Sequence, residues 1–218
     1  MRLVIFDVDG TLVDSQQVIH LGMTAAFEAV GLPVLPKEQV LATVGLSLPV
    51  AMARLAPHAD TSVHALLVEA YKDAFTAARI KEFAPLYPGA LECIEALSAR
   101  DDLLLAIATG KGRRGLLPML DTYGLHGRFF SLQTADDHPS KPHPSMLHRA
   151  MSEAGVESER AVMIGDTTYD IEMAVAAGIP AIGVAWGYHP VEALQNAGAV
   201  QVAQDFSALS AAIEDWAV

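Results

Sequence analysis

Two carboxylates near the amino terminus have the spacing of a catalytic or metal-binding pair. Asp7 and Asp9 follow the apolar segment 2–6, are separated by one residue, and come directly before Gly10. Residues two apart on an extended segment point the same way, so both side chains are expected to face one site. Two like charges at this spacing repel each other unless a cation or a proton lies between them. The pair therefore indicates a metal site or an acid and base that act together.

The residues around this pair predict the element that positions it. The segment 2–6 has the unbroken apolar character of a short buried strand, Gly10–Thr11 is the expected turn, and a helix is expected to begin near residue 15. Asp7 and Asp9 would then lie at the carboxyl end of a strand, where open α/β sheets bind ligands. The plain structural alternative is an Asp-Gly turn in which Asp9 caps the next helix.

Strand-like and helix-like segments alternate along most of the chain. Apolar runs that we expect to be strands lie at 103–108, 129–133, 161–164, 181–186 and 199–202. Segments with helical spacing lie between most of these runs, at 88–100, 112–123, 144–154 and 169–177. This alternation is typical of βαβ units, so the sequence predicts an α/β fold with a mostly parallel sheet.

The segment from residue 15 to about residue 83 breaks the alternation. It contains no strand-like run, and its apolar residues recur at helical spacing between breaks at 31–33, 44–47 and 56–57. We expect residues 15–83 to form a small α-helical domain inserted after the first strand. Residues 1–14 and 84–218 would form the α/β core domain, and the insertion would lie over the strand end that carries Asp7 and Asp9.

Polar residues follow three further predicted strands in the same way. Thr109–Gly110 offers a hydroxyl and an unhindered backbone amide, which suit an anion. Lys141, held by the proline that follows it, comes after the run 129–133, and an acidic turn with Asp166 and Asp170 follows the run 161–164. The plain structural roles would be a helix cap for Thr109 and a favourable helix-dipole charge for Asp170.

Composition and charge exclude several classes of protein. The chain has 218 residues, of which 52% are hydrophobic and 18% charged, which is typical of a globular protein with a sizeable core. The net charge of −12 disfavours nucleic acid as a partner, because phosphate backbones are bound by clustered Lys and Arg. No apolar run reaches the ~18 residues that a membrane span requires, so we expect a soluble, cytoplasmic protein with no membrane partner. The single cysteine, Cys93, is expected to be a buried apolar residue.

The ordered set of polar turns resembles the haloacid dehalogenase (HAD) superfamily, in its phosphatase branch. The segment Asp7-Val8-Asp9-Gly10-Thr11 is similar to the first motif of that family, and Thr109–Gly110 to the second. Lys141–Pro142 and the turn from Gly165 to Asp170 are similar to the third and fourth. The resemblance covers the whole chain, because the helical insertion lies where the family carries a helical cap. It implies a Rossmann-like three-layer core, and the nearest group in appearance is the phosphoglycolate-phosphatase-like hydrolases.

The resemblance implies a role for each acidic residue. Asp7 would attack phosphorus and form an aspartyl-phosphate, and Asp9 would protonate the leaving alkoxide and later deprotonate the attacking water. Mg²⁺ would be the cofactor, held by Asp7, the backbone carbonyl of Asp9, and Asp166. Asp170 would lie behind these groups and orient Lys141 or a metal-bound water.

The resemblance also assigns the phosphate-binding residues. Thr109 and the Gly110 amide would hold the phosphoryl oxygens, and Lys141 would balance charge on the phosphate and on Asp7. Three more cations lie close by, at Lys111, Arg113 and Arg114. Their place at a predicted helix start is unfavourable for the helix dipole and hints at use, but a solvated helix face is the simpler interpretation.

The function that this resemblance implies is Mg²⁺-dependent hydrolysis of a small phosphomonoester, either phosphoglycolate-like or a sugar phosphate. A sugar phosphomutase of the β-phosphoglucomutase type shares the same four motifs and stays an alternative. A catalytically idle phosphate-binding or regulatory protein is an alternative of another class. The partner would be a small-molecule phosphate ester, and the chain would be a monomer or a homodimer. His20 and the turn 44–47 are candidates for contacting the leaving group.

Overall fold

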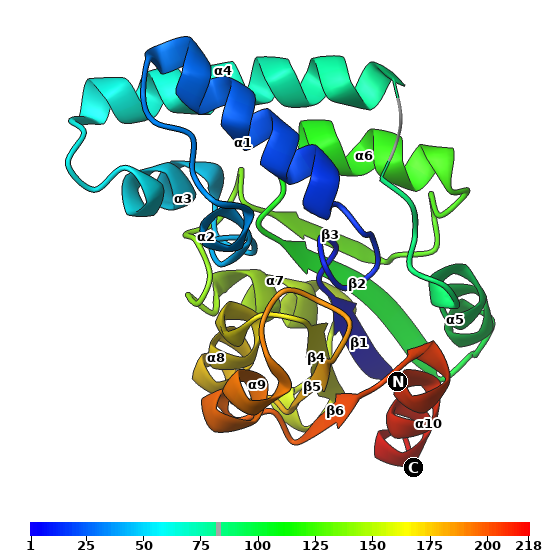
Figure 1. Ribbon diagram of the computed structural model, residues 1–218. Coiled ribbons are helices and arrows are strands. Elements are labelled where there is room, and N and C mark those ends of the chain that lie inside the picture. Colours follow the sequence, from blue (N-terminus) through cyan, green and yellow to red (C-terminus); the bar gives the residue numbers. More distant parts are fainter. Residues whose placement is uncertain (82–83) are drawn as a thin grey trace.

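The computed structural model describes residues 1–81 and 84–218, and a six-stranded sheet forms its centre (Figure 1). The strand order is β3-β2-β1-β4-β5-β6, and the pairings between these strands are parallel. The strands are β1 (Arg2–Phe6), β2 (Leu103–Thr109), β3 (Ser131–Thr134), β4 (Ala161–Gly165), β5 (Ala181–Val184) and β6 (Gln201–Ala203). Since β1 is central and covered on both faces, its sequence is apolar throughout rather than alternating.

Helices cover both faces of the sheet. One face carries α5 (Ala90–Ser98), α6 (Arg113–Thr122) and α10 (Phe206–Trp216), and the other carries α7 (Ser145–Ala154), α8 (Thr168–Ala177) and α9 (Val191–Ala197). The single turn of 3₁₀-helix Ser158–Arg160 leads into β4. Val4 and Phe6 pack into the first apolar layer, and Leu3 and Ile5 into the second. The predicted α/β fold with a three-layer core is confirmed.

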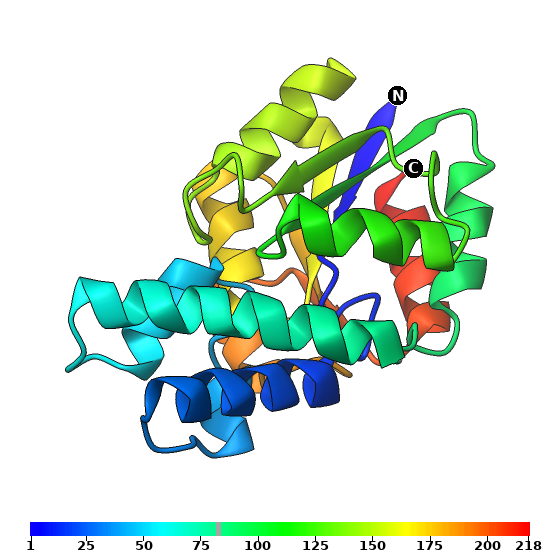
Figure 2. The same ribbon diagram turned by 90° about the horizontal axis from the view of Figure 1, so that it is seen from above.

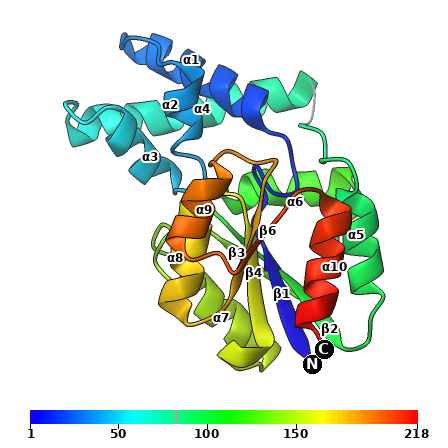
Figure 3. The same ribbon diagram turned by 60° about the horizontal axis from the view of Figure 1, so that its bottom comes forward.

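Four helices stand over one end of this core, and we call them the cap. They are α1 (Gln16–Val30), α2 (Lys37–Leu41), α3 (Leu48–Leu55) and α4 (Thr61–Lys81). Figure 2 shows α1 and α4 lying side by side, and Figure 3 shows the cap at the end of the sheet opposite to the two chain termini. The cap has an apolar cluster of its own, centred on Phe27, Met52 and Leu67.

The domain boundaries stay a prediction. The last described helix of the cap ends at Lys81, and the predicted crossing back to the core includes Glu82 and Phe83, which lie outside the described residues. The other predicted crossing, from the core into the cap, lies near Asp14. The backbone amide of Asp14 donates a hydrogen bond to the Pro85 carbonyl at 2.8 Å. The two crossings therefore lie next to each other.

Differences from the predicted elements lie mostly at strand starts. Strands β3 and β6 begin two residues later than predicted, because Phe130 and Val200, which suggested earlier starts, are exposed. The last two helices were not among the predicted ones. The start of α10 has a readable signal, since the Asp205 side chain accepts a hydrogen bond from the Ala208 amide at 2.8 Å. Cys93 is buried as predicted.

None of the described helices combines the length and the apolar composition that crossing a bilayer requires.

Candidate active site

The predicted functional residues meet at the carboxyl edge of the sheet. Asp7 directly follows β1, Thr109 is the last residue of β2, and Asp166 directly follows β4. These three strands are neighbours in the order β2-β1-β4, so their ends lie side by side. Lys141 reaches the same place from the loop after β3. The parallel sheet therefore brings together residues that are up to about 160 positions apart in the sequence.

Lys141 is the cation at the centre of the site. Its side chain is fully buried, and its Nζ lies 2.8 Å from Asp7 Oδ1 and 2.5 Å from Asp170 Oδ1. Burial lowers the pKa of Lys141, but the two carboxylates outweigh burial, so its pKa is raised and the side chain stays protonated. Asp170 is fixed in turn by Thr167, whose hydroxyl donates to Asp170 Oδ2 at 2.7 Å in a capping box at the start of α8.

Asp166 is held rigidly in the same cluster. Its Oδ1 accepts a hydrogen bond from the Thr11 hydroxyl at 2.8 Å, and its Oδ2 accepts one from the Tyr188 amide at 2.9 Å. Gly10 has a φ of 91° and lies so close that a Cβ there would collide with the Asp166 carboxylate. Burial, followed by the nearby charge of Asp170 and Asp7, raises the pKa of Asp166 well above its usual range.

The charges in the site do not balance. Four carboxylates, those of Asp7, Asp9, Asp166 and Asp170, face the two ammonium groups of Lys111 and Lys141, which leaves a net charge of −2 when all six are ionised. Burial is also the main reason why the pKa of Asp7 is raised to about 7, with Lys141 opposing it and Asp170 and Asp9 adding to it. Buried charge of one sign requires a counter-charge.

A hard divalent cation fits this imbalance. Asp7, Asp166 and Asp170 each offer a carboxylate oxygen, and these oxygens lie within 4.8 Å of one another. An all-oxygen ligand set suits cations of the Mg²⁺ and Ca²⁺ type. The carboxylate of Asp9 is not part of this group, so a contribution of Asp9 through its backbone carbonyl stays a prediction. Asp170, which was expected only to support the site, lies within the group.

Asp9 is paired with Lys111, for which the simpler interpretation of the sequence was a solvated helix face. Lys111 Nζ lies 2.8 Å from Asp9 Oδ2 and 4.9 Å above the centre of the Phe75 ring, which belongs to α4 of the cap. The other oxygen of Asp9 is buried and has no hydrogen-bond partner among the described residues. The solvated helix face expected for this segment is therefore wrong for Lys111, although Arg113 is exposed as expected.

The second motif lies where the cap approaches the core. The Thr109 hydroxyl accepts a hydrogen bond from the Lys111 amide at 3.2 Å, and α6 starts only at Arg113, so Thr109 is not the helix cap that the plain alternative proposed. A Cβ at Gly110 would lie 2.5 Å from the Gly45 carbonyl oxygen. Position 110 therefore has no room for a side chain beneath the cap turn.

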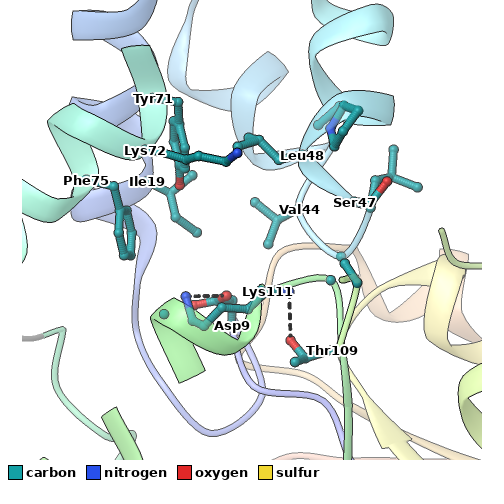
Figure 4. Close-up of a pocket in the computed structure, with 18 of the residues that line it drawn as sticks. Asp9, Ile19, Val44, Ser47, Leu48, Tyr71, Lys72, Phe75, Thr109 and Lys111 are labelled. Carbon is teal, nitrogen blue, oxygen red and sulfur yellow. Dashed lines mark hydrogen bonds and ion pairs between the residues drawn. The ribbon is translucent and has the colours of Figure 1, made fainter. Parts of the chain in front are cut away.

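A cleft of about 320 Å³ lies between the sheet edge and the cap (Figure 4). Asp7, Asp9 and Thr109 line it from the core, and Tyr71 and Phe75 line it from the cap. Of the two predicted leaving-group contacts, the turn 44–47 lines this cleft among the described residues, and His20 does not. The aromatic pair had no sequence signal, because its residues share the spacing of the apolar stripe of α4.

Comparison with known proteins identifies a family. The family model described as "Haloacid dehalogenase-like hydrolase" matches residues 4–184. "Probable phosphatase IndB" of Dickeya dadantii is 36% identical over 210 residues, which cover 94% of this chain and 90% of that protein. A "Phosphoglycolate phosphatase" of Pseudomonas savastanoi pv. phaseolicola is 36% identical, with 86% of this chain and 71% of that protein covered. A crystal structure of a hydrolase from Pseudomonas syringae superposes with a TM-score of 0.88 and 25% identity, and the match covers 99% of each chain.

The buried position of Lys141 predicts a large loss of stability when its charge is removed. Lys141→Met should lower the free energy of unfolding by about 3–5 kcal/mol at pH 8 in EDTA, because Asp7 and Asp170 would lose their buried counter-charge. Urea denaturation measures this loss. Arg149→Met is the control, since its pair with Glu153 is exposed and should contribute no more than about 1 kcal/mol. A Lys141→Met protein as stable as the control would contradict the described ion pairs.

Proposed function

The chain belongs to the haloacid dehalogenase-like hydrolase family, and on this premise we propose that it is a phosphatase that hydrolyses a small phosphomonoester with Mg²⁺ as cofactor. The observation that carries the proposal is the buried contact of 2.8 Å between Lys141 and Asp7 at the edge of the cleft. A carboxylate held by a fixed ammonium group, with one side open to a cleft, suits attack on an electrophilic phosphorus.

Two residues would carry the bond changes. An oxygen of Asp7 attacks phosphorus, the bond from phosphorus to the ester oxygen breaks, and Asp9 gives its proton to the leaving alkoxide. Water then attacks the phosphorus of the aspartyl-phosphate, Asp9 accepts a proton from that water, and inorganic phosphate leaves with Asp7 regenerated. Asp9 suits this double role because it lines the cleft and one of its oxygens has no partner among the described residues.

The other residues would bind and balance charge. Thr109 and the Gly110 amide would hold phosphoryl oxygens, and Lys141 would offset the negative charge that develops on them. Mg²⁺ would be held by Asp7, the Asp9 carbonyl and Asp166, and when bound it supplies the positive charge that the site lacks. Asp170 would keep Lys141 in place, which its short contact with the Lys141 ammonium supports.

The two alternative functions have a common test. Release of inorganic phosphate from a panel of phosphomonoesters, including p-nitrophenyl phosphate, supports hydrolysis. Transfer of the phosphoryl group within a sugar phosphate, without release, would support a phosphomutase. An absence of turnover over a range of pH and divalent metals would support a phosphate-binding protein.

Metal binding is predicted independently of activity. The EDTA-treated protein should bind about one Mg²⁺ per chain in isothermal titration calorimetry, and its affinity should fall as the pH is lowered through about 7, where Asp7 becomes protonated. Asp166→Asn should weaken this binding by roughly 10-fold or more, because it removes one ligand charge. Asp101→Asn is the matched control, since Asp101 is exposed just before β2, at the opposite end of the sheet. Equal affinities for both variants would contradict the assignment.

Lys111 is predicted to position Asp9 for its two proton transfers. Lys111→Met should lower kcat by roughly 10-fold or more, because Asp9 loses the contact that fixes its carboxylate, while KM changes less. Arg113→Met is the control from the same segment, since its pair with Asp137 is exposed, and it should stay within twofold of wild type. If both variants keep wild-type kcat, the Lys111 contact has no part in the reaction.

A further inference from the structure

The cap side of the cleft is apolar. The core side supplies charged and hydrogen-bonding groups, whereas most of the cap residues that line the cleft are aliphatic or aromatic. These are Ile19, Met23, Val44, Leu46, Leu48, Pro49, Ala51, Val68, Tyr71 and Phe75. Since the phosphoryl group must lie against the core residues, the leaving group has to face this apolar wall (Figure 4).

Several polar cap residues at the cleft are already engaged within the cap. The Thr43 hydroxyl donates to the Val40 carbonyl at 2.8 Å, and the Thr76 hydroxyl donates to the Lys72 carbonyl at 2.7 Å. The Lys72 ammonium, which extends from α4 at the cleft, forms an ion pair of 2.7 Å with the exposed Glu69.

No described cap residue therefore offers an unpaired cation to the cleft. Among the described cap residues that line the cleft, Ser47 and Tyr71 offer neutral hydroxyls for which no hydrogen bond is found. From the core, Lys111 is paired with Asp9, and Arg114 of α6 also lines the cleft. A carboxylate that faces the cap wall would thus exchange water for mostly apolar side chains, which is unfavourable.

Two aromatic rings that stack on each other form part of this wall. Tyr71 and Phe75 are one helical turn apart on α4, with ring centres 5.6 Å apart and planes 26° from parallel. A cleft of about 320 Å³ has the volume of roughly ten water molecules and lies at the lower end of the range for small-molecule sites. It therefore has room for a phosphoryl group and a single ring.

We propose that the preferred substrate is a phosphomonoester whose leaving group is an uncharged ring that packs against the apolar wall of the cap, of which Tyr71 and Phe75 are part. This inference rests on the proposed phosphatase function and narrows its substrate class. A hydroxyl or similar polar group on the ring would find the Tyr71 hydroxyl, which forms no hydrogen bond with the described residues. A small acid such as glycolate would find no unpaired cation among the described residues of the cap wall.

The test compares two primary alkoxide leaving groups of opposite character. With Mg²⁺ present, kcat/KM for benzyl phosphate should exceed that for phosphoglycolate by 10-fold or more, since apolar contacts in a pocket discriminate by roughly 10–200-fold. Benzylphosphonate and phosphonoacetate, which cannot be hydrolysed at the phosphorus–carbon bond, should inhibit in the same order. Their inhibition constants report the cleft alone, without differences in leaving-group reactivity.

Variants locate the preference on the rings. Phe75→Leu should lower the ratio of the two kcat/KM values by fivefold or more, and because Phe75 also contacts Lys111, the ratio rather than the absolute rate is the readout. Val68→Ala gives a second variant of the same wall if Phe75→Leu unfolds the cap. Leu66→Ala is the control on α4, since Leu66 is 59% exposed and lies outside the cleft, and it should leave the ratio unchanged.

The outcomes separate the two proposals. A ratio that favours phosphoglycolate, or inhibition constants in the reverse order, would overturn the apolar-ring inference and leave the phosphatase function intact. A preference for benzyl phosphate that neither Phe75→Leu nor Val68→Ala reduces would also overturn it. No hydrolysis of any phosphomonoester would overturn both.

Discussion

Four carboxylates at one edge of a parallel sheet can stay ionised only if cations lie among them, and this constraint organises the structure. Lys141 lies between Asp7 and Asp170, and Lys111 lies against Asp9. Two lysines neutralise two of the four carboxylates, so one divalent cation would neutralise the other two. An all-oxygen ligand set suits such a cation. The sheet order places β1 between β2 and β4, so that charged groups at these neighbouring strand ends lie close enough to interact. Without that order the same residues would be separate, solvated turns.

The cap strengthens this electrostatic arrangement because it covers it. Charges interact more strongly where water is excluded, so a covered site makes each ion pair and each hydrogen bond more effective. Core and cap are joined beside the site. The Ser47 amide donates to Ser140 Oγ at 2.8 Å, one residue before Lys141, and Arg54 of α3 donates to the Tyr169 hydroxyl at 2.6 Å. In the proposed function, the cap would contribute to the chemistry by enclosing it, and to selectivity by the surface it presents to the leaving group.

Much of the site could be predicted because each of its motifs is a short segment of the sequence and the order of parallel strands brings these segments together. An acidic turn after a buried run is visible in the sequence, and parallel strands bring such turns to one edge. The contacts of Lys111 could not be predicted in this way, since the neighbours that bury it, Asp9 and Phe75, come from distant segments. The starts of β3 and β6 were missed for a related reason, because Phe130 and Val200 are apolar but exposed, and sequence patterns assume that apolar residues are buried.

Asp7 is the residue proposed to form a covalent bond to phosphorus, and the phosphorylated residue can be identified directly. The protein is mixed with Mg²⁺ and a phosphomonoester that it hydrolyses, and the reaction is quenched rapidly in acid. The quenched protein is then reduced with borohydride and analysed by peptide mass spectrometry. Asp9→Asn should slow both the formation and the hydrolysis of the intermediate, because Asp9 is the acid of the first step and the base of the second. We expect the label on Asp7 and none in an Asp7→Asn protein. Label on Asp9, on a serine or on a histidine, or full turnover by the Asp7→Asn protein, would contradict this expectation.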